Sequence, residues 1–468
     1  MKHFQSLLCC MKIYRYIFRP SGPGEGAVMK RTAMIFPVVA LILTMSLATA
    51  SPGRAGGLSL RECVNRALTQ NPLAAEGRLG VEAGGQGLLS ARGKHLPRLS
   101  LDMNYALRQD PAPFIPAQAI TVPARFSDEY AAWGVSLVLP VYQGGQILNN
   151  VDLAAVRRDL QEYSLARTLN DLIANTVNTY NKILQLASLR EASSASVAAL
   201  EEQLKSTRLL FDVGRIARVD LLKVEVQLAN ERQRLLTLDE GIATAGATLR
   251  YLMGEDPGGG AGPPLLSDNL VVQAAPSDPA SGPLDAARQR PEYLAAVKGV
   301  EEAELSRKIA LGKLLPAVNA TGGYTDQYGF RPSYDETNWF IGLQASVPLF
   351  DRSLSVDLAR GKTLRDKATE RLRVVDHQLR LEVGTSVASL RESAHRVETA
   401  RQVIEQARES FRIEREKFGS GAGTMTDLLL AQAADITAEA NLAQALFDYN
   451  AALVAYRTAT GTLEEYIR

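Results

Sequence analysis

The sequence predicts a mixed α/β membrane protein in which membrane-spanning strands lead into long helical hairpins. Three observations predict this fold class. The chain contains an internal repeat, and four short segments alternate between apolar and polar residues with a period of two. In addition, two long stretches almost free of proline and glycine carry the 3–4 spacing of apolar residues that is typical of helices. Each stretch would form a helix about 100 Å long at 1.5 Å per residue, which implies coiled-coil packing.

The internal repeat consists of three sequence blocks that occur in the same order in both halves of the chain. A chance resemblance would not keep three blocks in order with so few gaps, so we interpret the repeat as a duplication. The matched blocks are 71–105 with 290–324, 134–145 with 342–353, and 211–222 with 418–429, at offsets of 219, 208 and 207 residues.

The N-terminal segment 1–50 is predicted to be an export signal peptide, and Met29 is predicted to be the true initiator. A basic start at Met29 precedes an apolar run and a small-residue cleavage site before Ser51. A retained membrane anchor is the alternative, although a spanning helix needs about 20 apolar residues. Cleavage would leave Cys63 as the one cysteine of the mature chain, so no internal disulfide can form.

The first repeat is expected to span residues 58–254 and the second residues 284–461, with a Gly/Pro-rich linker at 255–283 between them. Both repeats share one order of elements, namely helix, two strands, long helix, turn and helix. In the first repeat we predict a helix at about 58–95, strands at about 98–108 and 130–141, and helices at 146–210 and 220–253. In the second we predict a helix at about 285–315, strands at about 317–325 and 338–348, and helices at 353–418 and 427–460.

The four predicted strands each have one apolar and one polar face. Leu99, Leu101 and Met103 alternate with Ser100 and Asp102 in the first of them. Strands of this kind fit the wall of a transmembrane barrel, although a half-buried soluble sheet would show the same period. Polar or Pro-rich loops are expected at 109–129 and 326–337. Four strands cannot close a barrel, and open edges are not tolerated in lipid, so several chains would have to share one barrel.

These features together resemble the TolC-like outer-membrane efflux proteins. The resemblance rests on Asn71-Pro72 at the start of the repeat, on the paired turns with the pattern F-x-x-G-x-x-x-x-x-D-L-L, and on prolines at the strand–helix junctions. The junction prolines are Pro97, Pro140, Pro316 and Pro348.

The resemblance implies a homotrimer whose twelve strands form one outer-membrane barrel, continued by a helical coiled-coil barrel in the periplasm. The linker 255–283 would lie in the equatorial region of that helical part. The chain would be a passive conduit of a tripartite efflux or type I secretion system. Its partners would be a periplasmic adaptor, an inner-membrane pump of RND, ABC or MFS type, and outer-membrane lipid.

The resemblance also implies that the two turns form the functional tip of the helical part. One set of residues would contact the adaptor, although the aspartates among them could equally be helix caps. This set comprises Val213, Gly214, Arg215, Asp220, Leu221, Gly421, Thr424, Asp427 and Leu428. A second set would form the periplasmic gate, with a ring of three carboxylates at the narrowest point attracting cations. This set comprises Asp427, Leu430, Phe418 and Asp220.

The gate is expected to differ from that of the family prototype. A tyrosine and an arginine lock the prototype's closed state, whereas Phe418 and Gly423 stand at those positions here. Arg215 or Arg218 could pair with Asp427 instead, while most surface arginines are simply solvated. Leu430 would give a hydrophobic ring in place of a second acidic one.

Enzyme motifs do not occur in the sequence. There is no G-x-x-x-x-G-K-S/T loop, no G-x-S-x-G turn, and none of the four histidines has a neighbour at metal-ligand spacing. The chain has 52 Lys+Arg against 51 Asp+Glu, so its charge does not favour nucleic-acid binding. We therefore predict a non-enzymatic protein without a cofactor or metal. A structural periplasmic coiled-coil protein with a soluble β domain is the alternative.

Overall fold

The computed structural model describes residues 57–115, 124–258, 262, 264–274, 283–331 and 333–463. The predicted signal peptide at 1–50, with Met29, lies outside the described residues, as does part of the predicted linker at 255–283. None of the helices within the described ranges combines the length and the apolarity that crossing a membrane would require.

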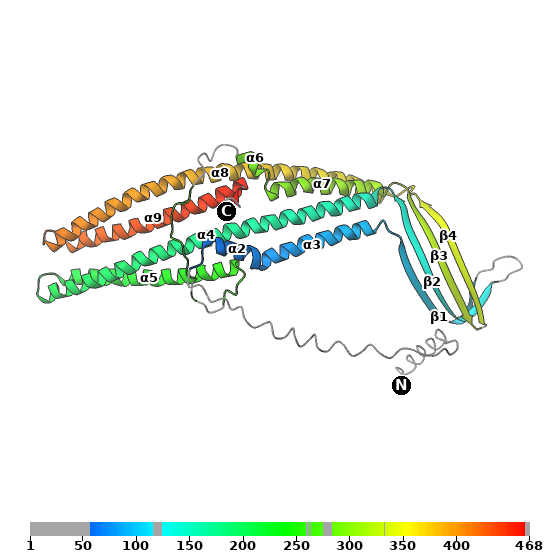
Figure 1. Ribbon diagram of the computed structural model, residues 1–468, viewed down its shortest axis with the longest axis horizontal. Helices are drawn as coiled ribbons and strands as arrows, with labels where there is room; N and C mark the ends of the chain where they lie inside the picture. The colour runs from blue at the N-terminus through cyan, green and yellow to red at the C-terminus, as the bar shows by residue number, and fades with distance from the viewer. Residues whose placement is uncertain are drawn as a thin grey trace, which may run out of the picture. The chain divides into compact units, whose positions relative to one another are not determined.

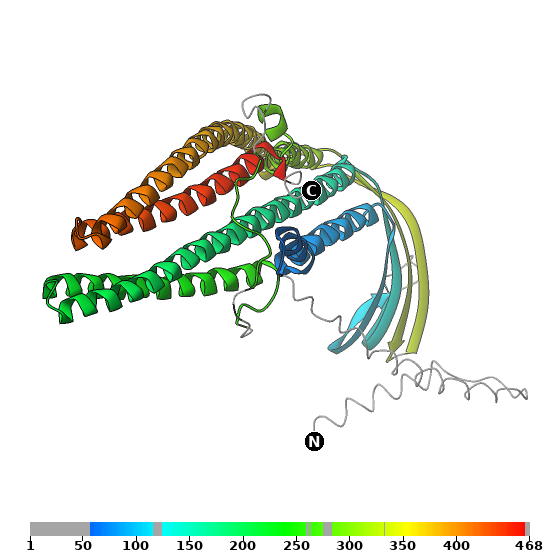
Figure 2. The same ribbon diagram turned by 60° about the vertical axis from the view of Figure 1, so that its left-hand side comes forward.

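Four antiparallel strands form one curved sheet whose order follows the sequence (Figures 1 and 2). The strands are β1 (Arg98–Ile115), β2 (Arg125–Gln143), β3 (Ala317–Phe330) and β4 (Ser333–Ser346). Each strand pairs with the next one along the chain, and this includes β2 with β3, which belong to different repeats. The sheet therefore joins the two repeats directly.

The strands are longer than the sequence pattern predicted, because pairing continues where the alternation of apolar and polar residues stops. We expected loops at 109–129 and 326–337, but β1 runs to Ile115 and β3 to Phe330. An apolar face is needed only within the hydrocarbon of a membrane, so strand segments beyond it lose the period of two. The loop predictions were wrong for this reason.

One face of the sheet carries the apolar side chains that the alternation predicted. Leu101, Val135, Tyr324 and Trp339 are register partners and form one row across all four strands. Leu101 is 57% exposed and Trp339 is 71% exposed. A soluble sheet would cover such a face with other elements, so the exposure favours a membrane-facing wall over a soluble β domain.

The four predicted junction prolines lie where strands meet helices. Pro97 and Pro316 immediately precede β1 and β3. Pro140 lies near the end of β2, where the ladder with β3 shifts its register, and Pro348 follows shortly after β4. Proline has no amide hydrogen to donate to a ladder, which explains the register shift at Pro140.

The helices form two sets with the same arrangement. The first repeat contains α2 (Leu60–Gln70), α3 (Pro72–Gly93), α4 (Gln146–Asp212) and α5 (Arg218–Leu252). The second contains α6 (Pro283–Ala287), α7 (Pro291–Gly312), α8 (Arg352–Gly419) and α9 (Met425–Thr460). In the first set α3 and α5 both pack along α4, and in the second α7 and α9 both pack along α8 (Figure 1). Each repeat thus contributes one continuous helical column and one broken column.

The helices expected at about 58–95 and 285–315 are each divided, immediately before Pro72 and Pro291. A residue that precedes proline is pushed out of the α region, and proline itself suits the first position of a helix. Asn71 is therefore extended, with ψ 130°, and its side chain accepts a 2.8 Å hydrogen bond from the Leu73 amide. Its amide group also donates to the Leu252 carbonyl at 2.8 Å, which ties α3 to the end of α5.

The described linker residues 264–274 connect the two helical hairpins. Tyr180 of α4 donates a 2.7 Å hydrogen bond to Asp268, and Asn450 of α9 donates a 3.0 Å bond to the Val271 carbonyl. Cys63 is fully buried beside Tyr180. Burial raises the pKa of the Cys63 thiol to about 12, so the thiol stays protonated and unreactive.

Candidate functional site

The two turns between antiparallel helices lie at the ends of α4 and α8 farthest from the strands (Figure 1). Residues 213–217 connect α4 to α5, and residues 420–424 connect α8 to α9. We call these the first and the second turn. They occupy equivalent places in the two repeats, so differences between them show where the repeats have diverged.

Both turns end the long helix in the same way, with a glycine in the left-handed conformation. Gly214 has φ 71° and Gly421 has φ 79°. The next residue donates back to the helix in each case, Arg215 to the Leu210 carbonyl at 2.8 Å and Ala422 to the Lys417 carbonyl at 2.9 Å. This pattern is the Schellman motif. The space around both glycines is open, so the backbone angle rather than crowding requires glycine.

The second turn starts α9 with a capping pair. The Thr424 hydroxyl accepts a 3.1 Å hydrogen bond from the Asp427 amide and donates a 2.6 Å bond to the Asp427 carboxylate. The pair satisfies one free amide at the start of α9 and places a negative charge in its first turn. Thr424 is therefore the N-cap of α9, and the Asp427 carboxylate supports it by accepting from the Thr424 hydroxyl.

The first turn lacks such a cap, and its aspartate has a different partner. Ala217 precedes α5 without a side-chain hydrogen bond. Asp220 accepts instead from the Lys223 ammonium at 3.3 Å. The same ammonium donates a 2.9 Å hydrogen bond to the Thr426 hydroxyl on α9. Lys223 therefore connects the first turn to the second.

An apolar cluster lies directly beside this polar connection. Val224 of α5 packs against Met425 and Leu428 of α9, and all three side chains are at most 4% exposed. Leu204, Phe411, Phe418 and Leu429 surround them. The tips of the two helical hairpins are thus held together by apolar packing and by one charged hydrogen bond.

Two of the expected adaptor-contacting side chains point into the protein. Leu221 is 9% exposed and Leu428 is 3% exposed, so neither can contact an adaptor in this conformation. Both occupy helix positions that face a neighbouring helix, and the sequence motif alone did not reveal this. Phe418 likewise packs on the apolar cluster and does not project as a gate residue.

Other predicted residues remain accessible at the tip. Val213 is 70% exposed, and Gly214, Arg215 and Gly421 are also exposed. Leu430 is 64% exposed and lies three residues beyond Asp427. Its equivalent in the first repeat is Lys223, at the offset of 207 residues. The two repeats therefore present a cation and an apolar side chain at equivalent places.

The alternative pairing of Asp427 with an arginine of the first turn is not found among the described residues. Within the described part of the chain, neither Arg215 nor Arg218 makes an ion pair, and Asp427 bonds to Thr424. The cross-hairpin contact made by Lys223 was missed by the sequence analysis. The spacing Asp220-x-x-Lys223 could have indicated a lysine held beside the turn, because residues three apart lie on one face of a helix.

Charged side chains follow the exposed faces of α8 and α9 above the tip. Glu409 accepts a 2.7 Å hydrogen bond from Arg412, and this bond holds the pKa of the glutamate below its usual value. Asp435 differs, because burial raises the pKa of its carboxyl group. One of its oxygens has no hydrogen-bond partner. The charge of the half-buried Asp435 carboxylate is therefore incompletely compensated.

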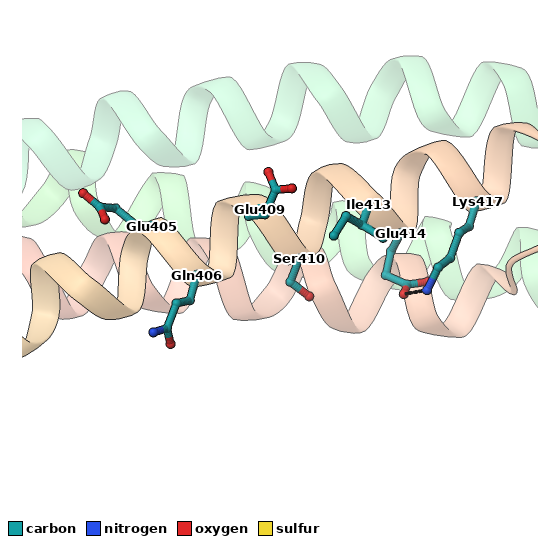
Figure 3. A pocket seen from close by; sticks show the side chains of 7 residues that line it. All are labelled: Glu405, Gln406, Glu409, Ser410, Ile413, Glu414 and Lys417. Atoms are coloured by element: carbon teal, nitrogen blue, oxygen red, sulfur yellow. Dashed lines mark hydrogen bonds and ion pairs between the residues drawn. The ribbon is translucent and has the colours of Figure 1, made fainter.

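A shallow trough runs along α8 near the second turn (Figure 3). Seven side chains line it, and all come from this one helix, including Glu405, Glu409 and the Glu414–Lys417 ion pair at 2.7 Å. Small-molecule sites are concave and gather polar groups from several elements. The trough therefore lacks the features of a ligand site. The described residues also contain no group of three or more His, Cys, Asp or Glu side chains that could hold a metal.

Comparisons with known proteins agree with this architecture. The family model described as "Outer membrane efflux protein" matches residues 63–255 and 283–462. The chain is 24% identical over 333 residues to the outer membrane efflux protein BepC of Brucella suis, covering 70% of this chain and 72% of BepC. It is 23% identical over 423 residues to the outer membrane protein TolC of Vibrio cholerae, covering 87% and 91%.

A similar fold occurs among solved structures. The outer membrane protein VceC of Vibrio cholerae superposes with a TM-score of 0.74 at 17% identity, over 86% of this chain and 96% of VceC. At this identity the likeness concerns the fold, namely a four-stranded sheet attached to long helical hairpins.

Proposed function

The chain belongs to the outer membrane efflux protein family, and from that premise we propose how its paired turns act in transport. Members of the family are homotrimeric outer-membrane channels that work with an adaptor and an inner-membrane pump. The chain is accordingly an outer-membrane efflux channel whose helical part extends into the periplasm. The family is one of channels and not of enzymes.

The first part of the proposal is that the exposed parts of both turns receive the helical tips of a periplasmic adaptor. Val213, Gly214 and Arg215 of the first turn and Gly421 of the second are exposed and project beyond the helices. Left-handed glycines keep these turns narrow, which lets a partner helix approach the backbone. The pump behind the adaptor would be of RND, ABC or MFS type, and a type I secretion system would use the same surface.

The second part of the proposal is that the contact between the two hairpin tips forms the periplasmic gate. The observation that carries it is the bond from Lys223 to Thr426, which lies beside the apolar cluster of Val224 and Met425. Separation of the hairpins would break this bond and expose the cluster, so the contact favours the closed channel. Asp427 and Leu430 are exposed beside it and would line the constriction around the three-fold axis.

Proline substitutions at the turns test this proposal. Gly214→Pro and Gly421→Pro fix φ near −65° where the turns need about +70°, so each should distort one tip and abolish export. Gly384→Ala is the matched control, because Gly384 lies within α8 in open space. Export is measured as drug resistance in a strain that lacks its own channel, and trimer assembly as heat-modifiable gel mobility. Normal export by both assembled proline variants would remove the turns from the mechanism.

A further inference from the structure

We propose that β4 of one protomer pairs with β1 of a second copy of this chain in one defined register, with Leu343 opposite Tyr105 of the partner subunit. The proposal rests on the trimeric barrel of the family and adds the residue-by-residue pairing between subunits. It follows from the free edges of the sheet, from an exposed segment after β4, and from the symmetry of the internal repeat.

The sheet has two edges that the described chain does not cover. Its order is β1-β2-β3-β4, so β1 and β4 each have one partner strand among the described residues. Unpaired backbone amides and carbonyls on an edge strand are too costly in lipid to remain open. An antiparallel partner must therefore lie along each edge, and β1 of one copy is free to serve β4 of another.

The segment after β4 has the sequence of a strand but no partner strand among the described residues. β2 continues to Gln143 because its last residues pair with the start of β3, with Tyr142 opposite Val318. The equivalent of Tyr142 in the second repeat is Phe350, at the offset of 208 residues. Yet β4 ends at Ser346, and Phe350 is 92% exposed. The second repeat thus has the residues of a longer strand and lacks its partner.

The repeat offsets correctly describe the pairing that is present. In the first repeat Leu101 of β1 lies opposite Val135 of β2. The offsets of 219 residues for the first strand and 208 for the second convert this pair into Ala320 and Leu343. These two residues are opposite each other in the ladder of β3 with β4. The two repeats therefore pair their strands in the same register.

Applied to the residue pairs of the β2–β3 ladder, the same offsets give the residue pairs of the ladder between subunits. Val135 lies opposite Tyr324, and these residues correspond to Leu343 and Tyr105. Further partners follow in the antiparallel direction, and the register shift between Pro140 and Tyr142 is carried over to the segment between Pro348 and Phe350. The resulting pairs are Ala345 with Met103, Val347 with Leu101, Phe350 with Leu99 and Asp351 with Arg98 of the partner subunit.

The chemistry of these pairs supports the register. Side chains of the apolar face meet one another, as Val347 and Leu101 of the partner subunit do, whereas a shift by one residue would place apolar against polar ones. The register also places Asp351, whose carboxylate accepts from the Ser353 amide at the start of α8, opposite Arg98 of the partner subunit. Arg98 makes no ion pair within the described residues of its own chain. Opposite charges that face each other across strands stabilise the pairing.

Cysteine cross-linking tests the register. In a Cys63→Ala background, the pair Tyr105→Cys with Leu343→Cys should convert most monomer into covalent trimer on a non-reducing denaturing gel, after oxidation in the outer membrane. Opposite residues have Cα atoms about 4.5–5.5 Å apart, which a disulfide can span. Leu101→Cys with Val347→Cys tests the same register elsewhere, so a folding defect in one variant does not decide the outcome.

The matched control is Tyr105→Cys with Ile341→Cys, which lies on the same face but two residues out of register. Diagonal partners are about 7–8 Å apart, so this pair should stay monomeric on the gel. Efficient cross-linking of the control pair would overturn the proposed register. So would the absence of cross-linking in both register pairs when the trimers are assembled. Either outcome would leave the channel function intact. Failure of every variant and of the parent to form heat-modifiable trimers would overturn the register and the trimeric channel together.

Discussion

Removal of the Lys223 ammonium should open the proposed gate. Lys223→Met keeps the length of the side chain but loses the 2.9 Å hydrogen bond to Thr426. Hydrogen bonds to charged groups contribute about 1.5–3 kcal/mol, but partly exposed ones fall nearer 0.2–1 kcal/mol. Because the Lys223 side chain is 40% exposed, we take about 0.7 kcal/mol for each protomer. Three protomers then give about 2 kcal/mol, or about a 30-fold increase in the ratio of open to closed channels.

Single-channel recordings in planar bilayers measure this ratio directly. Lys223→Arg should behave like the parent protein, because it keeps a charged donor. Thr426→Val should resemble Lys223→Met, and the double variant should add nothing further, since both changes remove the same bond. Parent-like gating of Lys223→Met would refute the reasoning, and so would two independent effects that add fully in the double variant.

Three further predictions concern the helical part. Asn71→Ala should destabilise the protein by about 2–4 kcal/mol, because it removes a helix cap and leaves the buried Leu252 carbonyl unpaired. Thr424→Ala removes an exposed helix cap and should destabilise the protein by only about 1 kcal/mol. Equal melting temperatures of the two variants would contradict this. Asp427→Asn should shift the reversal potential in a salt gradient toward lower cation preference, and an unchanged potential would place selectivity elsewhere. Asp435→Asn should raise the melting temperature at pH 7, since burial raises the carboxyl pKa and penalises its charged form. The gain should decline as the pH falls through that raised pKa and disappear below the ordinary pKa of an aspartate. A pH-independent gain would indicate a packing effect instead.

Much of the candidate site could be located from the sequence, but not the directions of its side chains. The duplicated turns were found because Gly214 and Gly421 occupy equivalent positions, and glycine is what a left-handed backbone requires. Leu428 was misassigned as a contact residue, because a turn motif does not say which helix face meets a neighbour. Lys223 was missed because its partner Thr426 lies on the other hairpin, more than 200 residues along the chain.

The sequence by itself determined the local elements, because they depend on neighbours only a few residues away. Alternation with a period of two indicated membrane-facing strands, and the scarcity of proline and glycine indicated the two long helices. Tertiary structure alone decided how far the strands extend into the polar region, since pairing there depends on the adjacent strand and no longer on an apolar face. It also decided which tip residues are buried and which connect the hairpins, because these contacts arise only when the tips of the two hairpins meet.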